Sequence, residues 1–480
     1  MVLFSLLMVL ICLNACSGAK TSDNVTVYVT TNDRAKDFVR SEIALGDKQA
    51  ASPSVITIDP SVRYQTMDGF GAAVTGSTCY NLMRMAPEDR TAFLKETFSD
   101  TEGMGYSYIR ISIGCSDFSL SEYTCCDTKG VENFALQSEE KEYVIPILKE
   151  ILAISPSIKI LGSPWTCPRW MKVDNLKDLR PFESWTSGQL NPAYYQDYAT
   201  YFVKWIQAME AEGIPIEAIT PQNEPLNRGN SASLFMGWEE QLSFVRDALG
   251  PKLKETGLKT KIYAFDHNYN YDNMLEQQGY PMKIYEDENA ASFLTGAAYH
   301  NYGGDREELN NVNGKFPDKE LIFTETSIGM WNDGRNLEKR LMEDMREVAL
   351  GTVNNWCKGV IVWNLMLDNE RGPWREGGCK TCYGAVDISR DDYKTMTYNS
   401  HYYIIGHLST VVKPGAVRIE SKGVAEKGLM YSAFDNPDGT VAFVLLNGGR
   451  MEVRLTVTDG KNCVDCVVPA KSVASYRWKK

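Results

Sequence analysis

Two glutamates in this sequence follow short apolar runs and could act together on one bond. Glu224 comes after the run 216–219, and Glu325 comes after the run 321–323. Runs that are apolar on both faces are typical of buried parallel strands. Catalytic groups of a parallel barrel gather at the carboxyl ends of its strands, so we expect both carboxylates on that face. Two carboxyl groups about 5–5.5 Å apart can hydrolyse a glycosidic bond with retention of configuration.

Residues of three other types support this chemistry. Asn223 precedes Glu224 and can donate an amide hydrogen bond to a sugar 2-hydroxyl. Pro225 restricts the residue before it, so we expect an extended backbone at Glu224. Arg110 lies in an otherwise apolar run, where an unpaired guanidinium would be costly. We therefore expect Arg110 to pair with a carboxylate. Pairing with Glu325 would keep that group ionised, and a structural ion pair elsewhere in the barrel is the alternative.

Alternating strand-like and helix-like segments must position these residues. Amphipathic runs separate the candidate strands, which are 65–74, 106–113, 158–164, 216–221, 261–266, 294–300, 320–324 and 359–363. This pattern predicts an α/β fold, a (β/α)8 TIM barrel. A doubly wound open sheet is the alternative, but no glycine-rich phosphate loop follows the first strand.

After residue 407 the pattern changes to short strand-like runs separated by turn signals such as Asn447-Gly448-Gly449. These runs predict a smaller antiparallel β-sandwich domain built mainly from the C-terminus, to which 26–30 and 55–58 could add strands. We therefore expect a signal peptide at 1–16, a tether and joining strands at 17–62, the catalytic barrel at 63–405 and the sandwich at 406–480.

The N-terminus carries an apolar run, 2–13, that suits a signal peptide. It ends in Leu13-Asn14-Ala15-Cys16-Ser17, which resembles the bacterial lipobox. The resemblance implies cleavage before Cys16 and lipidation of its thiol, with a plain secretory signal as the alternative. We expect an exported lipoprotein at the cell surface, on the outer membrane or in the periplasm.

Cysteines are numerous, 12 in all, and two pairs have Cys-x-x-Cys spacing: Cys379/Cys382 and Cys463/Cys466. Four such thiols could bind zinc, but the pairs fall in different predicted domains. Export favours disulfides, whose partners the sequence does not assign. We expect no metal and no cofactor.

Net charge and composition limit the classes of partner that the protein can bind. A net charge of −12 argues against nucleic acid and anionic membranes as partners, so a neutral substrate fits best. Aromatic residues make up 11% of the chain, which suits a groove that stacks sugar rings. We expect a monomer whose only membrane contact is the anchor at Cys16.

Further motifs occur before, between and after the two glutamates, and together they span nearly the whole chain. They are Gly69-Phe70-Gly71, Tyr108-Ile109-Arg110-Ile111, Cys115-Ser116-Asp117-Phe118, Ser163-Pro164-Trp165-Thr166-Cys167-Pro168, Asn223-Glu224-Pro225, His300-Asn301-Tyr302, Thr324-Glu325-Thr326 and Trp363-Asn364-Leu365. With these motifs the chain resembles glycoside hydrolase family 30, the family of the lysosomal glucosylceramidase.

The resemblance implies a role for each matching residue. Glu224 corresponds to the general acid/base and Glu325 to the nucleophile of a double displacement through a covalent glucosyl-enzyme. The substrate-binding set that it implies, with His300 in a supporting role, is Arg110, Asp117, Trp165, Asn223, His300, Tyr302 and Trp363.

One loop of the protein distinguishes between the possible substrates. Residues 374–383, with Cys379 and Cys382, resemble the cysteine-containing loop of family members that cut β-1,6-glucan. An endo-acting β-1,6-glucanase is therefore the favoured hypothesis, with a neutral β-glucan polysaccharide or oligosaccharide as its partner. A β-glucosylceramidase is the alternative. A xylanase is more distant, and a catalytically silent glycan-binding protein would lack one of the carboxylates.

Overall fold

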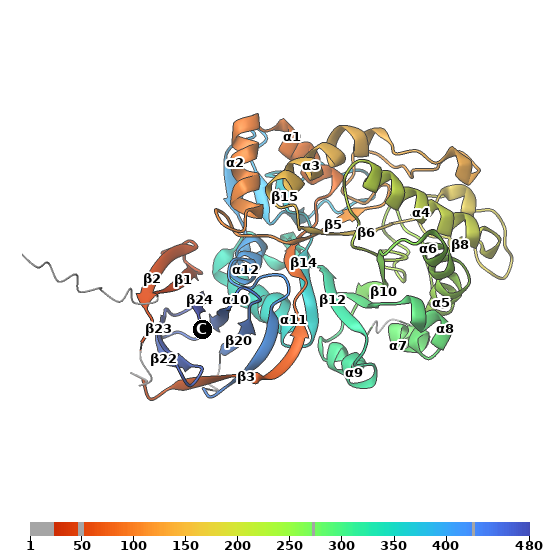
Figure 1. The fold of residues 1–480 in the computed structure, drawn as a ribbon. Coiled ribbons are helices and arrows are strands. Elements are labelled where there is room, and N and C mark those ends of the chain that lie inside the picture. The colour runs from red at the N-terminus through yellow and green to blue at the C-terminus, as the bar shows by residue number, and fades with distance from the viewer. Residues whose placement is uncertain (1–23, 47–51, 271–273, 425–427) are drawn as a thin grey trace, which may run out of the picture.

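The computed structural model describes residues 24–46, 52–270, 274–424 and 428–480. The predicted signal peptide, lipobox and Cys16 lie outside these residues. Two domains pack side by side, a large barrel and a smaller sheet domain that contains the C-terminus (Figure 1).

The large domain is the predicted barrel of eight parallel strands. In sheet order they are β4 (Gly69–Ala72), β14 (Cys357–Val362), β12 (Glu320–Glu325), β11 (Gly296–His300), β10 (Lys261–Asn268), β9 (Ala218–Ile219), β6 (Lys159–Ser163) and β5 (Tyr108–Ser112). A parallel bridge between Ala73 and Arg110 joins the two outermost strands. The N–H of Val74 also donates to the Arg110 carbonyl at 2.8 Å, which closes the barrel.

Apolar side chains fill the barrel interior. Tyr108, Leu161, Tyr263 and Ile322 belong to one fully buried cluster contributed by different strands. A Cβ atom on Gly71 would lie 2.0 Å from the Tyr108 carbonyl oxygen, so β4 and β5 can approach only with glycine at this position. The runs that are apolar on both faces are therefore the strands buried on both faces.

Helices cover the outside of the barrel (Figure 1). The α-helices are α1 (Gly76–Arg84), α2 (Pro87–Phe98), α3 (Ile145–Ile154), α4 (Tyr195–Ala211), α5 (Trp238–Phe244), α6 (Gly250–Thr256), α7 (Tyr280–Tyr285), α8 (Glu288–Phe293), α9 (Glu307–Lys315), α10 (Leu337–Asp344), α11 (Leu350–Val353) and α12 (Ser400–Ser409). π-helical turns precede or extend three of them: η2 (Glu140–Val144), η5 (Val245–Leu249) and η8 (Met345–Ala349). Tyr198, Phe202, Ile206 and Met209 form the buried face of α4, as their helical spacing predicts.

The small domain is the predicted sandwich, and both ends of the chain build it. Its nine strands, in sheet order, are β2 (Val39–Ala44), β1 (Asn24–Thr31), β24 (Ser472–Lys479), β21 (Thr440–Asn447), β20 (Leu429–Asp435), β19 (Val417–Lys422), β3 (Val55–Thr66), β22 (Val453–Thr458) and β23 (Cys463–Val468). Val27, Ile56, Phe443, Leu455 and Trp478 belong to its separate core. The N-terminal strands expected near 26–30 and 55–58 are thus β1 and β3.

The buried helix α12 lies between the two domains (Figure 1). His407 on this helix contacts Ser475 Oγ at 2.8 Å through Nδ1 and Thr30 Oγ1 at 2.9 Å through Nε2. Burial lowers the pKa of His407 to about 3, so the neutral ring joins strands from both ends of the chain to the barrel.

The two Cys-x-x-Cys pairs behave differently. Cys379 and Cys382 form a disulfide, whereas Cys463 and Cys466 are free and buried on β23. Cys125 and Cys126 are also free and buried. A zinc site of four thiols from both pairs is therefore excluded by the disulfide.

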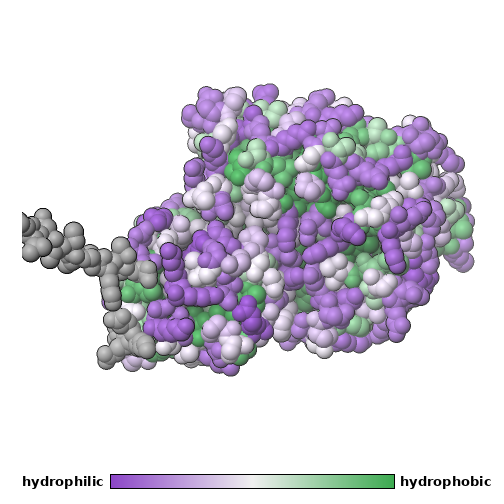
Figure 2. Space-filling view, in the orientation of Figure 1, coloured by the Kyte–Doolittle hydropathy of each residue, from purple (hydrophilic) through white to green (hydrophobic). Residues whose placement is uncertain are grey.

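Hydrophilic side chains cover most of both domains on the face drawn in Figure 2, and hydrophobic residues show as scattered patches among them. Among the described residues, no helix combines the length and the apolar character that crossing a membrane requires.

The interface histidine predicts an acid sensitivity of the fold. Its folded pKa, about 3, lies below the ordinary value of 6.5, so its contribution is complete above pH 6.5 and is lost as the pH falls towards 3. In His407→Asn the free energy of unfolding should fall less steeply across this window, by up to about 1.4 kcal/mol per pH unit. Urea denaturation at several pH values measures the slope, and a slope equal to that of the wild type would contradict the assignment.

Candidate active site

The carboxyl ends of the barrel strands surround a pocket of about 490 Å³. Five of the nine site residues predicted from the sequence line it: Asp117, Glu224, Tyr302, Glu325 and Trp363. The other four, Arg110, Trp165, Asn223 and His300, lie directly behind these side chains and contact them or each other. The structure therefore brings all nine residues into one cluster at the predicted face of the barrel.

Arg110 binds three oxygen atoms from three different strand ends. Its Nη1 donates to Glu325 Oε2 at 2.5 Å, and its Nη2 donates to Asn223 Oδ1 and Asp266 Oδ2, each at 2.7 Å. The Arg110 side chain is fully buried, so these partners replace the water it loses. The expected pair of Arg110 with Glu325 is confirmed.

Asp266 is the second anion on the guanidinium, and it is also fully buried. It accepts hydrogen bonds from the hydroxyls of Ser163, Thr220 and Thr324, which lie on or just beyond β6, β9 and β12, at 2.7–2.9 Å. Its other oxygen is 3.0 Å from His300 Nε2. Burial opposes its charge, but Arg110 and His300 hold the pKa of Asp266 well below its usual range.

Glu224 has a backbone that the sequence does not predict. Its φ is +43°, in the left-handed region, so the expected extended conformation is wrong. The Glu224 N–H donates to the Asp266 carbonyl at 2.9 Å, and the Glu224 carbonyl accepts from Asn227 N at 2.9 Å. These two contacts, together with Asn227 Nδ2 on Glu224 Oε2 at 2.7 Å, hold a strained residue at the pocket.

Carboxylate oxygens of Glu224 and Glu325 lie within 4.8 Å of each other and of a His300 ring nitrogen. One oxygen of each carboxylate within 4.8 Å fits the group separation of about 5–5.5 Å in retaining glycosidases better than that of about 6.5–9.5 Å in inverting ones. The same three residues could hold a metal ion. However, the Arg110 guanidinium already occupies Glu325, and both nitrogens of His300 face carboxylates.

The charged groups of the cluster shift one another's pKa values. Burial raises the pKa of Glu325; His300 and Arg110 lower it, and burial outweighs them. Although burial disfavours its charge too, Glu224 faces His267 and His300, which lower its pKa to about 2. Burial likewise opposes the charge of His300, but Glu325, Asp266 and Glu224 raise the pKa of His300 to about 9. Protonated His300 and ionised Glu224 are therefore an ion pair in the free protein, with His300 Nδ1 3.3 Å from Glu224 Oε1.

Two tryptophans form one side of the cluster. Trp165 and Trp363 stack with ring centroids 5.2 Å apart, and the Arg110 guanidinium lies 5.0 Å and 5.6 Å from the two rings. Trp363 lines the pocket, and Trp165 supports it from behind. Burial, followed by the charge of Glu325, raises the pKa of the nearby Asp117 carboxyl to about 7.

The disulfide loop forms another side of the pocket, to which Gly377, Gly378, Cys379 and Cys382 contribute. Its strand β16 (Cys382–Tyr383) pairs with β13 (Ile328–Gly329), which follows Glu325 in the chain. Buried Arg375 joins the loop to the segment around Asp117, because its Nε donates to the Ser116 carbonyl at 2.9 Å and its Nη1 to Glu122 at 3.0 Å. The loop is therefore attached to the segments that carry Glu325 and Asp117.

Several residues of the site were missed from the sequence. Asp266 is the last residue of a predicted strand, and Glu224 and Glu325 closely follow the ends of two others. The same position at a strand end could therefore have identified Asp266 from the sequence. No sequence pattern marks four other residues that line the pocket: Asn227 and Asn230 in the loop after Glu224, Asn268 at the end of β10, and Trp331 in a 3-10 turn after β13.

Comparisons with known proteins agree with this geometry. The chain is similar to an endo-1,6-beta-D-glucanase of Neurospora crassa, 32% identical over 422 residues, which cover 84% of this chain and 83% of the relative. It is also similar to the lysosomal acid glucosylceramidase of Mus musculus, 27% identical over 474 residues, covering 92% and 87%. A solved endo-beta1,6-glucanase structure matches with a TM-score of 0.94 and 68% identity, covering 95% of this chain and 99% of the other.

Two protein-family models match successive parts of the chain, one for each domain. The glycosyl hydrolase family 30 TIM-barrel domain matches residues 67–412, and the glycosyl hydrolase family 30 beta sandwich domain matches residues 415–476. With a barrel, a sandwich and a buried carboxylate pair at the barrel mouth, this chain belongs to glycosyl hydrolase family 30 and is a glycoside hydrolase.

Proposed function

We propose that this enzyme is an endo-acting β-1,6-glucanase that retains anomeric configuration. The observation that carries the retaining mechanism is the pair of carboxylates within 4.8 Å at an open polar pocket. The linkage is supported by the similarity to endo-β-1,6-glucanases, which reaches 68% identity over 95% of the chain. The disulfide loop lines the same pocket, as expected for a segment that selects the linkage.

In this proposal Glu325 is the nucleophile. Its Oε2 accepts from Arg110 at 2.5 Å and its Oε1 from the Tyr302 hydroxyl at 3.0 Å, which fixes the orientation of the carboxylate. The carboxylate attacks the anomeric carbon while the bond to the glycosidic oxygen breaks, and a covalent glucosyl-enzyme forms. Water then attacks the same carbon, displaces Glu325 and completes a double displacement.

Glu224 is the general acid and then the general base. The free protein holds the required proton on His300, 3.3 Å from Glu224, so a shift along this contact gives neutral His300 and protonated Glu224. Glu224 donates this proton to the departing oxygen and takes one back from the attacking water. His300 therefore serves as a positioning residue that stores the proton.

The remaining predicted residues bind sugar in this scheme. Asp117 and Trp363 line the pocket, with a carboxylate for sugar hydroxyls and an aromatic face for the ring. Asn223 gives its oxygen to Arg110, which leaves its amide NH2 group as the donor for a 2-hydroxyl. Trp165 supports the Trp363 ring from behind.

A β-glucosylceramidase is the second candidate. The similarity to the Mus musculus glucosylceramidase spans 92% of the chain, and Met330 and Trp331 expose about half of their surface just beyond Glu325. Two exposed apolar side chains at this place could meet a lipid.

We also propose that Cys16 carries a lipid anchor, which places the enzyme on the outer surface of a bacterial cell or in its periplasm. The lipobox-like segment Leu13–Ser17 supports this location. Mass spectrometry of the exported protein would detect acylation at Cys16. An unmodified N-terminus at another residue would contradict the proposal.

The substrate can be tested directly. Purified enzyme should release β-1,6-linked oligosaccharides from pustulan, a neutral β-1,6-glucan, and should release little glucose from glucosylceramide. Chromatography of products against time measures both activities. Release from glucosylceramide without release from pustulan would favour the second candidate and reject the first.

The two glutamates should respond differently to replacement. Glu325→Ala should lose turnover of every substrate and still bind oligosaccharide, since it lacks the nucleophile. Glu224→Ala should lose pustulan hydrolysis by about 10²–10⁴-fold but form the glucosyl-enzyme rapidly from an aryl β-glycoside, whose leaving group needs no proton. Glu217→Ala, just before β9 at the opposite end of the barrel, is the matched control. Near-normal rates for Glu325→Ala would refute the assignment.

The buried charges predict a movement of the pH profile in Asp266→Asn. Activity requires ionised Glu325 and a proton on the His300–Glu224 pair, so it falls at low pH through the Glu325 pKa and at high pH near the His300 pKa of about 9. Asp266 raises both pKa values, so its neutralisation should move both limbs of the profile to lower pH. The dependence of kcat/KM on pH measures this shift, and a profile that only loses height would contradict the proposed coupling.

A further inference from the structure

Arg375, in the disulfide loop, has a buried guanidinium that joins segments of the catalytic pocket. Its Nε donates to the Ser116 carbonyl at 2.9 Å and its Nη1 to Glu122 Oε1 at 3.0 Å, both in the loop after β5. Its Nη2 donates to the carbonyl of Ser231, in the loop between β9 and α5. The Ser231 hydroxyl in turn donates to Glu122 Oε1 at 2.7 Å, so these contacts form a closed network.

Two glycines of the disulfide loop bring its backbone against the same two segments. A Cβ atom on Gly378 would lie 2.4 Å from the Asp117 carbonyl oxygen. A Cβ atom on Gly377 would lie 2.6 Å from the Cβ of Ser231. The loop fits this closely only with glycine at both positions. The N–H of Gly378 donates to the Arg375 carbonyl at 3.0 Å, so one turn of the chain carries the guanidinium and the contact with Asp117.

Arg375 also acts on the charge of Asp117, a carboxylate that lines the catalytic pocket. Burial raises the pKa of Asp117, and Glu325 and Glu224 add to this effect. Arg375 lowers it, and the resulting pKa is about 7. Each carboxylate of the pocket thus has a cation that favours its charge: Arg110 for Glu325, His300 for Glu224 and Arg375 for Asp117.

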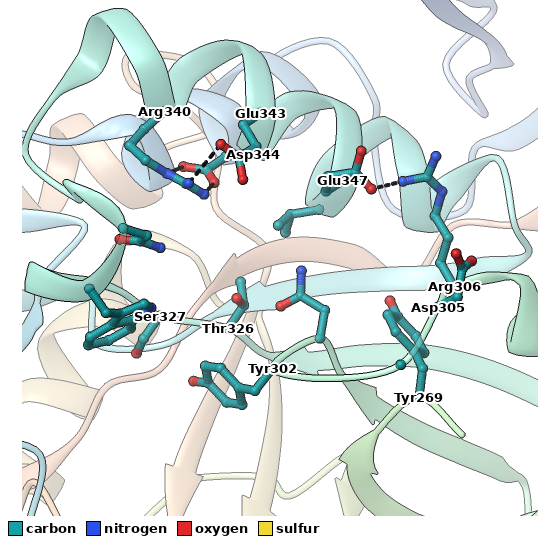
Figure 3. A pocket seen from close by; sticks show the side chains of 15 residues that line it. Tyr269, Tyr302, Asp305, Arg306, Thr326, Ser327, Arg340, Glu343, Asp344 and Glu347 are labelled. Atoms are coloured by element: carbon teal, nitrogen blue, oxygen red, sulfur yellow. Dashed lines mark hydrogen bonds and ion pairs between the residues drawn. The ribbon is translucent and has the colours of Figure 1, made fainter. Parts of the chain in front are cut away.

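A neighbouring cavity of about 340 Å³ offers a comparison for this arginine. Three side chains line both this cavity and the catalytic pocket: Tyr302, Ser327 and Trp331. Figure 3 shows Arg340 beside this cavity, next to Glu343 and Asp344 of the same helix. Arg340 is 7% exposed and Arg375 is 8% exposed. The ion pairs of Arg340 therefore stabilise one helix, whereas the equally buried Arg375 joins separate loops.

From these contacts we propose that Arg375 is a positioning residue for sugar binding, which holds Asp117 against the disulfide loop as one wall of the pocket. The guanidinium lies behind the lining residues, so it acts through Asp117 and not on the sugar itself. A lysine would lack the planar fork that reaches acceptors of two loops at once. This inference rests on the proposed role of Asp117 in binding sugar hydroxyls.

The test measures binding of a β-1,6-linked thio-glucotetraose, whose sulfur bridges resist hydrolysis, by calorimetry at several pH values. The affinity of the wild type should rise with pH through about 7, because ionised Asp117 accepts hydrogen bonds from sugar hydroxyls. Arg375→Met should raise the Kd about ten-fold, as expected when hydrogen bonds to a charged group are weakened. It should also move the midpoint to higher pH, since it removes the cation that lowers the pKa of Asp117.

Two further variants separate charge from geometry. Arg375→Lys keeps the charge and loses the fork, so the Kd should rise while the midpoint stays near that of the wild type. Arg340→Met is the matched control, because it removes an equally buried arginine whose carboxylate partners lie on its own helix. This control should change neither the Kd nor the midpoint.

A double-mutant cycle with Asp117→Asn distinguishes positioning from a general effect on the fold. If Arg375 acts through Asp117, Arg375→Met should change the Kd of Asp117→Asn by less than about two-fold. Arg375→Lys serves in the same cycle if Arg375→Met does not fold. Equal effects with and without Asp117, or an unchanged midpoint in Arg375→Met, would overturn this inference alone. Absence of binding by the wild type would reject the proposed substrate and this inference with it.

Discussion

The buried guanidinium of Arg110 is the constraint on which the rest of the site depends. A fully buried positive charge is stable only with anions and acceptors at close range, and Arg110 has Glu325, Asp266 and Asn223 within 2.7 Å. These partners come from the ends of three different strands. The charge of one arginine therefore fixes the distance between elements far apart in the sequence.

The barrel brings the partners of Arg110 together, and the same network of contacts holds Glu224 in its strained backbone conformation. Eight strands that are apolar on both faces bury their side chains and direct their carboxyl ends to one mouth. Asp266 continues the network from Arg110 to His300, and His300 reaches Glu224. The left-handed φ of Glu224 is tolerated because Asp266 and Asn227 bond its backbone on both sides. The strained backbone of Glu224 is thus held by the carbonyl of Asp266, the residue whose carboxylate also pairs with Arg110.

Sequence patterns predicted the strands, the sandwich and the glutamate pair, because each depends on a local signal: an apolar run, a turn, or a carboxylate at a strand end. The cost of burying a charge predicted a carboxylate partner for Arg110, and the family resemblance indicated Glu325 as that partner. The role of Asp266, the φ of Glu224 and the net shift of the Glu325 pKa did not follow, because they depend on side chains that meet across the barrel. Nor did the sequence indicate that Tyr302, Ser327 and Trp331 line a neighbouring cavity as well as the catalytic pocket, because this depends on how loops from separate strands pack.

The stereochemistry of the first product distinguishes a retaining from an inverting mechanism, and carboxylate oxygens within 4.8 Å of each other fit the closer group spacing of retaining enzymes. Proton NMR of the products released from a β-1,6-glucan, recorded before mutarotation, distinguishes the two anomers at the new reducing end. We expect the β-anomer to form first and then to equilibrate with the α-anomer. Initial formation of the α-anomer would contradict the double displacement at Glu325.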